Sequence, residues 1–213
     1  MAMRVAELWR YPVKSLAGEP LDTVDILPDG IPGDRVVQVY DARGRIVTSR
    51  TTPGLLGLRA TTSPTGVPLV DGTPWTAPEV AKKIESIAGV GARLVHDEGR
   101  ERFDVLPLLV ATDGAIDALG LDRRRFRPNI LVAGVEGLHE REWPGRRARI
   151  GEAIIGFEKL RGRCVMTTYD PDTLEQDPSV LRRIVQEMGG RLALDTDVVK
   201  AGRVSVGDPV ELL

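Results

Sequence analysis

The chain has 213 residues, of which 42% are hydrophobic and 28% charged, and its formal net charge is −2. This composition supports a large buried core and argues against disorder. Nucleic acid is not an expected partner, because polyanion-binding proteins carry a marked positive excess. The single cysteine allows no internal disulfide, which is typical of a reducing compartment. The N-terminus has no secretion-signal pattern, and no stretch approaches the roughly 20 apolar residues that span a bilayer, so we expect a soluble, cytoplasmic protein without a membrane partner.

Frequent glycine and proline, 23 and 15 residues, divide the sequence into short apolar runs. Runs of this length predict an α+β protein that is mostly β. Strands are expected at residues 5–11, 21–27, 36–40, 46–49, 55–61, 106–111, 130–133, 153–158, 203–206 and 210–213. The segment 41–44, Asp-Ala-Arg-Gly, predicts a hairpin turn. The charged stretch 98–102 is the best candidate for a boundary between domains 1–98 and 99–213.

Three helices are predicted from capping signals and apolar spacing. The first follows a capping-box pattern of Thr76 and Glu79, with Pro78 in its first turn. The second begins near Thr112 and ends before Gly120. The third runs from a cap at Asp177 to Gly189. The apolar residues of the first and third helices are assigned to the core: Val80, Ile84, Ile87, Leu181, Ile184, Val185 and Met188.

Cys164 is flanked by Arg161 and Arg163. Nearby positive charge favours the thiolate, which is the form of cysteine that attacks electrophiles and binds soft metals. The alternative is a small buried side chain without a reactive role, since neighbours along a strand point to opposite faces. The sequence leaves both interpretations open.

Several common catalytic motifs are absent, namely G-x-S-x-G, the Walker loop, H-E-x-x-H and C-x-x-C. The segment 89–94 lacks the third glycine of a dinucleotide fingerprint. His96 and His139 are the only histidines, too few for most zinc sites, and each is expected to be structural. Catalysis by a cysteine and a histidine stays conceivable, although no local pattern favours it.

Two further segments are candidates for anion binding. Lys14 and Ser15 follow Pro12 at the end of a predicted strand, where an ammonium group and a hydroxyl suit a phosphate; the alternative is a solvated lysine. Arg35 follows Asp34 and is expected either to pair with it or to reach inward toward an anion.

The basic run 123–125 predicts a solvated loop, whereas Arg127, Pro128 and Asn129 after it suggest a rigid site. Proline biases the residue before it toward extended conformations, so Arg127 and Asn129 would present a planar fork and an amide to a phosphate or a polar heterocycle. Thr112 lies at a strand-to-helix junction, which favours either anion binding or ordinary helix capping.

Six blocks in the same order resemble the MOSC proteins that carry an N-terminal β-barrel segment, a group that includes the mitochondrial amidoxime reducing component and its bacterial relatives. The similarity extends from about Val5 to Leu213. The blocks are residues 11–15, 33–35, 127–130, Trp143 with Ile150-Gly151, 163–173 and 206–210.

The resemblance implies a MOSC-type β-barrel with an N-terminal β-barrel segment and a few flanking helices, packed as one unit around a molybdenum cofactor. Cys164 would be the metal ligand and the catalytic residue. The remaining matched residues would bind the pterin and its phosphate: Lys14, Ser15, Arg35, Thr112, Arg127, Asn129 and Arg163. At family level the resemblance also implies pyridoxal phosphate binding.

The implied activity is the reduction of N-hydroxylated compounds, such as amidoximes and hydroxylamines, by removal of oxygen at molybdenum. The sequence has no flavin or iron–sulfur motif, so the electrons would come from a separate flavin or iron–sulfur reductase. The alternative is a cofactor carrier or sulfur-transfer module in which Cys164 holds a persulfide.

Overall fold

The computed structural model describes residues 2–213 and is built mainly of short strands. The α-helices are α1 (Pro78–Ala88), α2 (Asp113–Asp117) and α3 (Pro178–Met188). The 3-10 helices are η1 (Pro53–Gly57), η2 (Arg100–Arg102), η3 (Arg123–Phe126), η4 (His139–Glu142) and η5 (Val165–Thr168). The strands are β1 (Arg4–Arg10), β2 (Glu19–Leu21), β3 (Thr23–Ile26), β4 (Val37–Tyr40), β5 (Ile46–Val47), β6 (Ala60–Thr62), β7 (Pro68–Val70), β8 (Thr73–Pro74), β9 (Arg93–His96), β10 (Leu108–Thr112), β11 (Ile130–Ala133), β12 (Arg147–Ile150), β13 (Ala153–Gly162), β14 (Arg191–Lys200), β15 (Gly202–Ser205) and β16 (Val210–Leu212).

The largest sheet has the strand order β16-β12-β13-β14-β10-β11-β1-β2. The β10–β11 pair is parallel and its other pairs are antiparallel. The start of β1 also lies beside the start of β16, because an isolated bridge joins Arg4 to Pro209 and the Val210 N–H donates to the Met3 carbonyl at 3.0 Å. The mostly β fold is confirmed. Within residues 2–213 the predicted barrel is therefore a strongly curved sheet whose far sides meet through one bridge instead of a continuous ladder.

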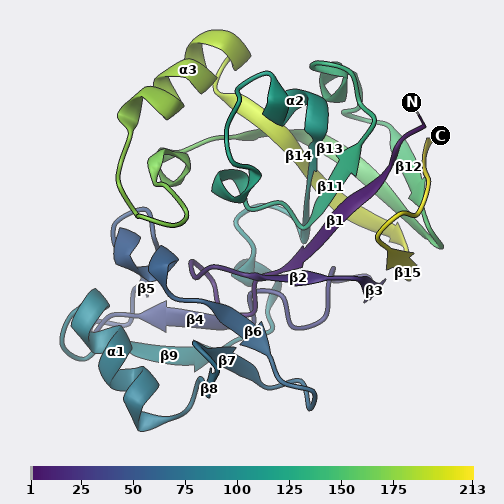
Figure 1. Ribbon diagram of the computed structural model, residues 1–213. Coiled ribbons are helices and arrows are strands. Elements are labelled where there is room, and N and C mark those ends of the chain that lie inside the picture. Colours follow the sequence, from purple (N-terminus) through teal and green to yellow (C-terminus); the bar gives the residue numbers. More distant parts are fainter. Residues whose placement is uncertain (1) are drawn as a thin grey trace.

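The concave side of this sheet encloses the main core. Leu8, Ile130, Ile155 and Leu194 are fully buried there, although they come from opposite ends of the chain. The short β3–β15 pair supplies Val24 and Val204 to the same core. As Figure 1 shows, the start of β1 and the C-terminal end of the chain lie next to each other, beside β12.

A second, smaller unit lies beside the main sheet and is drawn below it in Figure 1. It consists of the sheets β5-β4-β9 and β6-β7-β8 together with α1. Its buried members all lie between Val13 and Ala92, so it has its own core. Strands β1–β3 belong to other sheets even though they precede this unit in the chain. The predicted domain boundary at 98–102 stays a prediction.

Several predicted elements differ from the observed ones near glycine and proline. The strand expected at 55–61 is wrong, because Pro53 and Gly54 begin the 3-10 helix η1 and the strand β6 starts only at Ala60. The strand expected at 21–27 is divided between β2 and β3, which pair with β1 and β15 respectively. Five strands were not predicted: β7, β8, β9, β12 and β14.

The helices agree better with the prediction. In α1 the N-cap is Ala77, which makes no side-chain capping bond, so the capping box of Thr76 and Glu79 is wrong although the helix itself is present. Asp177 caps α3 by accepting from the Ser179 N–H at 2.8 Å, and Gly189 ends α3 in the left-handed region.

The predicted core stripe of α3 needs one correction. Ile184 and Met188 are buried, but Val185 is 54% exposed and the third buried position is Val180. The buried face of α3 is therefore the one that carries Val180, Ile184 and Met188, and the predicted face was turned too far toward Val185.

Candidate active site

A cavity of about 90 Å³ lies between the two units and contains Cys164. Among residues 2–213, Asp104 is the only carboxylate on its wall, and seven cationic side chains line it: Lys14, Arg35, Arg50, Arg125, Arg127, Arg161 and Arg163. Seven of the eight predicted site residues lie on this wall: Cys164, Lys14, Ser15, Arg35, Arg127, Asn129 and Arg163. A chain with net charge −2 thus concentrates positive charge around its one thiol.

Cys164 lies where β13 has ended and η5 begins. Its carbonyl accepts from the Thr167 N–H and hydroxyl at 3.1 and 2.9 Å, which fixes the turn while leaving the side chain on the cavity wall. Arg161 pairs with the buried Asp195 at 2.5 Å. The electropositive surroundings predicted for this thiol are therefore present.

Arg163 next to the thiol has no carboxylate partner among residues 2–213. Its Nη2 donates to the Phe126 carbonyl at 2.9 Å, and its buried Nε has no hydrogen-bond partner in that range. Burial, together with repulsion from Arg161, lowers the pKa of Arg163 to about 10, so the group is still charged at neutral pH. An unpaired buried donor on a charged group is costly unless a ligand completes it.

Arg127 is likewise without an ion pair among the described residues, and its guanidinium lies 4.3 Å from the centre of the Tyr11 ring. Burial lowers the pKa of Arg127 to about 10. The Tyr11 hydroxyl donates to the Pro128 carbonyl at 3.0 Å, and burial raises the pKa of Tyr11 to about 12, so the phenol stays neutral. The extended backbone predicted for Arg127 is wrong: it ends η3 with φ 55° and ψ 48°, and its N–H bonds to the Arg124 carbonyl.

Three residues on the wall of this cavity have an unusual backbone conformation. Ser15, Arg35 and Arg127 have φ values of 74°, 58° and 55°, in the left-handed region that side chains with a Cβ rarely adopt. Such residues cost on the order of 1–3 kcal/mol each and persist where the surroundings hold them, often at functional sites. Three of these residues on one wall indicate that this wall is shaped for a ligand.

Two ion pairs on the cavity wall share the carboxylate of Asp104. Lys14 Nζ lies 3.0 Å from one Asp104 oxygen, and Arg50 Nη2 lies 2.7 Å from the other. Lysine and arginine keep the pKa of Asp104 below its usual value against the opposing effect of burial. Burial alone would lower the pKa of Arg50, but Asp104 and the Cys164 sulfur together raise it. Arg50 and Asp104 were not predicted from the sequence; the position of Arg50 directly after a predicted strand was the available signal.

Arg35 and Asn129 belong to a second network, and both alternatives predicted for Arg35 occur together. Arg35 pairs with the buried Asp34 and also lines the cavity. The Asn129 amide accepts from the Leu109 N–H at 3.2 Å and donates to the Trp9 carbonyl and to Asp34 at 3.2 and 3.3 Å. Because these atoms already have protein partners, Asn129 mainly positions Arg35 and the strands around it.

Thr112 is the exception among the predicted site residues. It is fully buried, caps α2 by accepting from the Ala115 N–H at 3.4 Å, and donates to Glu140 at 2.8 Å. It is not on the cavity wall. The structure thus favours the capping interpretation over anion binding. His96 and His139 are also absent from that wall, so the geometry gives the cysteine–histidine hypothesis no support.

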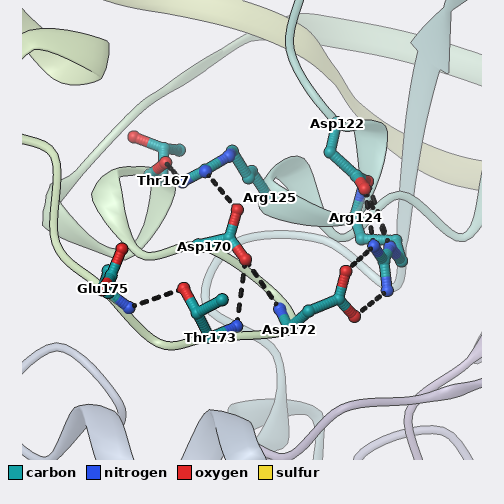
Figure 2. Close-up of polar contacts among 8 residues, drawn as sticks. All are labelled: Asp122, Arg124, Arg125, Thr167, Asp170, Asp172, Thr173 and Glu175. Atoms are coloured by element: carbon teal, nitrogen blue, oxygen red, sulfur yellow. Dashed lines mark hydrogen bonds and ion pairs between the residues drawn. The ribbon is translucent and has the colours of Figure 1, made fainter.

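The loop after η5 is held against η3 by charged contacts (Figure 2). Arg125 Nη2 lies 2.8 Å from Asp170, which also accepts from the Asp172 and Thr173 N–H groups. Arg124 donates to both oxygens of Asp172, at 2.8 and 2.7 Å, and to Asp122. These contacts fix the segment that follows Cys164. The segment 123–125 was predicted to be a solvated loop, but two of its arginines form ion pairs that hold the loop after η5 in place.

Comparison with known proteins decides the family. The model of the MOSC N-terminal β-barrel domain matches residues 2–109, and that of the MOSC domain matches residues 108–211. The chain belongs to the MOSC family. Mitochondrial amidoxime-reducing component 1 of Mus musculus is 27% identical over 98% of this chain and 82% of that protein. Mitochondrial amidoxime reducing component 2 of Macaca fascicularis is 24% identical over 97% of this chain and 82% of that protein.

Two further similarities concern part of the chain or its fold. A molybdenum cofactor sulfurase of Anopheles gambiae is 37% identical over 92 residues, which are 42% of this MOSC chain and 12% of that protein. The crystal structure of the YuaD protein from Bacillus subtilis superposes with a TM-score of 0.54 at 16% identity, covering 100% of this chain and 96% of that one. The likeness to YuaD supports the fold alone.

Proposed function

We propose that this MOSC protein holds a molybdenum cofactor in the Cys164 cavity and reduces N-hydroxylated compounds with it. One observation carries the proposal: a single thiol and seven cationic side chains share a wall with one carboxylate. Thiolate suits a soft metal, and clustered guanidinium groups suit a phosphate. One relative is named for the molybdenum cofactor, and two others are named for the reduction of amidoximes, which supports both parts of the proposal.

The residues present fit such a group. Within residues 2–213 no three His, Cys, Asp or Glu side chains gather into a metal site, so Cys164 would be a lone protein ligand to a metal whose other ligands come with the cofactor. The unpartnered Arg163 Nε and the unpaired Arg127 would find acceptors on it. Lys14 and the Ser15 hydroxyl would bind the phosphate, with Arg35 held in place by Asp34.

The cofactor, when bound, supplies two-electron redox chemistry. In the overall reaction the N–O bond of the substrate breaks, an electron pair and two protons are consumed, an N–H bond forms and water leaves. The chain's own part is to hold the cofactor, to keep the cavity positively charged and to orient the thiol through the turn at η5. The electrons would come from a separate flavin or iron–sulfur reductase.

The decisive experiment compares the metal content of the wild type with that of Cys164→Ser, both purified from a host that makes the cofactor. We expect molybdenum near one atom per wild-type chain and at least about tenfold less in the variant, because the hydroxyl is a poor ligand for a soft metal. Turnover of benzamidoxime with an artificial reductant would follow the metal. Equal, negligible molybdenum in both proteins would reject the cofactor proposal. Full loading without turnover would reject the reductase alone.

A second candidate is a cofactor carrier or sulfur-transfer module. It is favoured by the similarity of 92 residues to a molybdenum cofactor sulfurase. In that case Cys164 would carry a persulfide. Mass spectrometry of the native protein separates the two, because a labile sulfur adduct on Cys164 without molybdenum supports transfer, whereas molybdenum without the adduct supports the reductase.

Other expectations from the sequence stay predictions. These are the cytoplasmic location, the identity of the reductase and pyridoxal phosphate binding; two of the relatives are mitochondrial by name. In the described part of the chain, no helix is both long and apolar enough to cross a membrane.

A further inference from the structure

A second cavity of about 500 Å³ adjoins the Cys164 cavity. This volume is within the range of about 300–1,000 Å³ that is usual for small-molecule sites. Three aromatic side chains line it, namely Trp9, Tyr11 and Tyr169. The rings of Trp9 and Tyr11 are nearly parallel, at 19°, with centres 6.5 Å apart, and the Trp9 indole N–H is fixed by a 2.7 Å bond to Glu7. The aromatic part of the wall is therefore flat and held in place.

Two of the four arginines on this second wall are neutralised within the protein, whereas Arg59 and Arg127 have no carboxylate partner among residues 2–213. Arg124 pairs with Asp122 and Asp172, and Arg125 pairs with Asp170, as Figure 2 shows. Asp172 itself lies on the wall. With four arginines and Asp172 on its wall, against seven cations and Asp104 on the first, the second cavity has the smaller positive excess. Its three aromatic rings and its arginines suit a flat aromatic group, on whose faces both can stack.

The two cavities share part of their walls. Arg125, Arg127 and Met166 line both of them. Met166 lies two residues beyond Cys164, and its sulfur accepts from the Ser49 hydroxyl at 3.4 Å. A methionine side chain is flexible and adapts to what lies beside it. A ligand held in the second cavity thus lies one side chain away from the cavity of the thiol.

We propose that the second cavity binds the aromatic part of the substrate, so that the enzyme favours aryl N-hydroxylated compounds over small ones. Trp9 and Tyr169 would contact the ring, while Met166 and Arg127 separate it from the cofactor cavity. This inference depends on the proposed reductase function for its reaction, but the binding of an aromatic ring depends only on the cavity.

The test uses the molybdenum-loaded protein and the variants Trp9→Leu and Tyr169→Leu. We expect either variant to raise KM for benzamidoxime about tenfold or more, because a stacked aromatic contact and its buried area are lost. KM for hydroxylamine, which has no ring, would change less than about twofold. Molybdenum content would stay at the wild-type level. The matched control is Trp75→Leu, a half-buried tryptophan of the small unit that lines neither cavity.

Titration calorimetry with benzamide, which is planar and has no N–O bond, gives a readout independent of turnover. We expect binding to the wild type and to Trp75→Leu, and loss of at least about tenfold in affinity in Trp9→Leu and Tyr169→Leu. A fall in molybdenum content in these two variants would overturn the proposal, because the second cavity would then hold the cofactor. Equal rises in KM for both substrates, or no benzamide binding to the wild type, would overturn it too. Absence of hydroxylamine turnover with intact benzamide binding would instead reject the reductase function.

Discussion

The two adjoining cavities share Arg125, Arg127 and Met166 but differ in the amount of positive charge on their walls. Arg163 beside Cys164 and the shared Arg127 have no carboxylate partner within residues 2–213, whereas Arg124 on the second wall and the shared Arg125 are paired with aspartates. Partly desolvated cations without a counter-ion are costly in a folded protein. The unpaired cations beside the thiol are the reason for proposing an anionic ligand in the first cavity, and the three aromatic side chains are the reason for proposing an aromatic one in the second.

The largest change in anion affinity is expected when an arginine without an ion pair is replaced. Arg163→Met should weaken the binding of inorganic pyrophosphate to the cofactor-free protein by roughly 10- to 150-fold, because a charge-assisted hydrogen bond contributes about 1.5–3 kcal/mol. Titration calorimetry measures this. Arg124→Met, which removes a paired guanidinium, should change the affinity less than about threefold. Equal losses in the two variants would break the distinction between the cavities.

An intermediate effect is expected at Asp104, whose carboxylate bridges Lys14 and Arg50 at 3.0 and 2.7 Å. Asp104→Asn should raise the affinity of the cofactor-free protein for pyrophosphate by about five- to tenfold, because a negative charge that competes for both cations is removed. The control is Asp25→Asn, which breaks the exposed pair with Arg203. Weaker binding by Asp104→Asn would show instead that this carboxylate holds the two cations in their binding positions.

The smallest effect concerns pH and the loop at the second cavity. Backbone N–H groups of Thr173 and Asp172, with help from Arg125, keep the pKa of Asp170 below its usual value. A carboxyl group whose pKa is lowered by folding stabilises the protein above its unfolded pKa, and this contribution is lost as pH falls through the folded value. The difference in thermal unfolding midpoint between wild type and Asp170→Asn should be constant from about pH 7 to about pH 5 and should shrink in stronger acid. A difference that shrank already between those two values would contradict this assignment.

Much of the site could be predicted because its residues lie in short, rigid segments. Cys164 with its two arginines, and Lys14 with Ser15, were recognisable from local chemistry and from their order along the chain. Arg50 and Asp104 could not be found in this way, since their importance comes from a contact between residues 54 positions apart. Thr112 fitted two interpretations equally well in the sequence, and only its buried bond to Glu140 separated them.

The fold shows the same division between local and distant information. Helix α3 was predicted from its cap and its glycine, and β11 from a short apolar run, because both signals are local. Strand β14, which is ten residues long, was missed although it lies between β13 and β10 in the main sheet. Its segment contains Asp195 and Asp197, which depress strand propensity, and pairing on both sides overrides that preference.

The sequence by itself determined the mostly β composition, the family and the candidate residues for an anion and a soft metal, because residue types and their order carry that chemistry directly. Only the tertiary structure decided which cations lack a partner, that Arg127 adopts a left-handed backbone, and that an aromatic cavity adjoins the thiol. These properties depend on distances between segments far apart in the chain, and pairing and burial set those distances when the sheets close around the site.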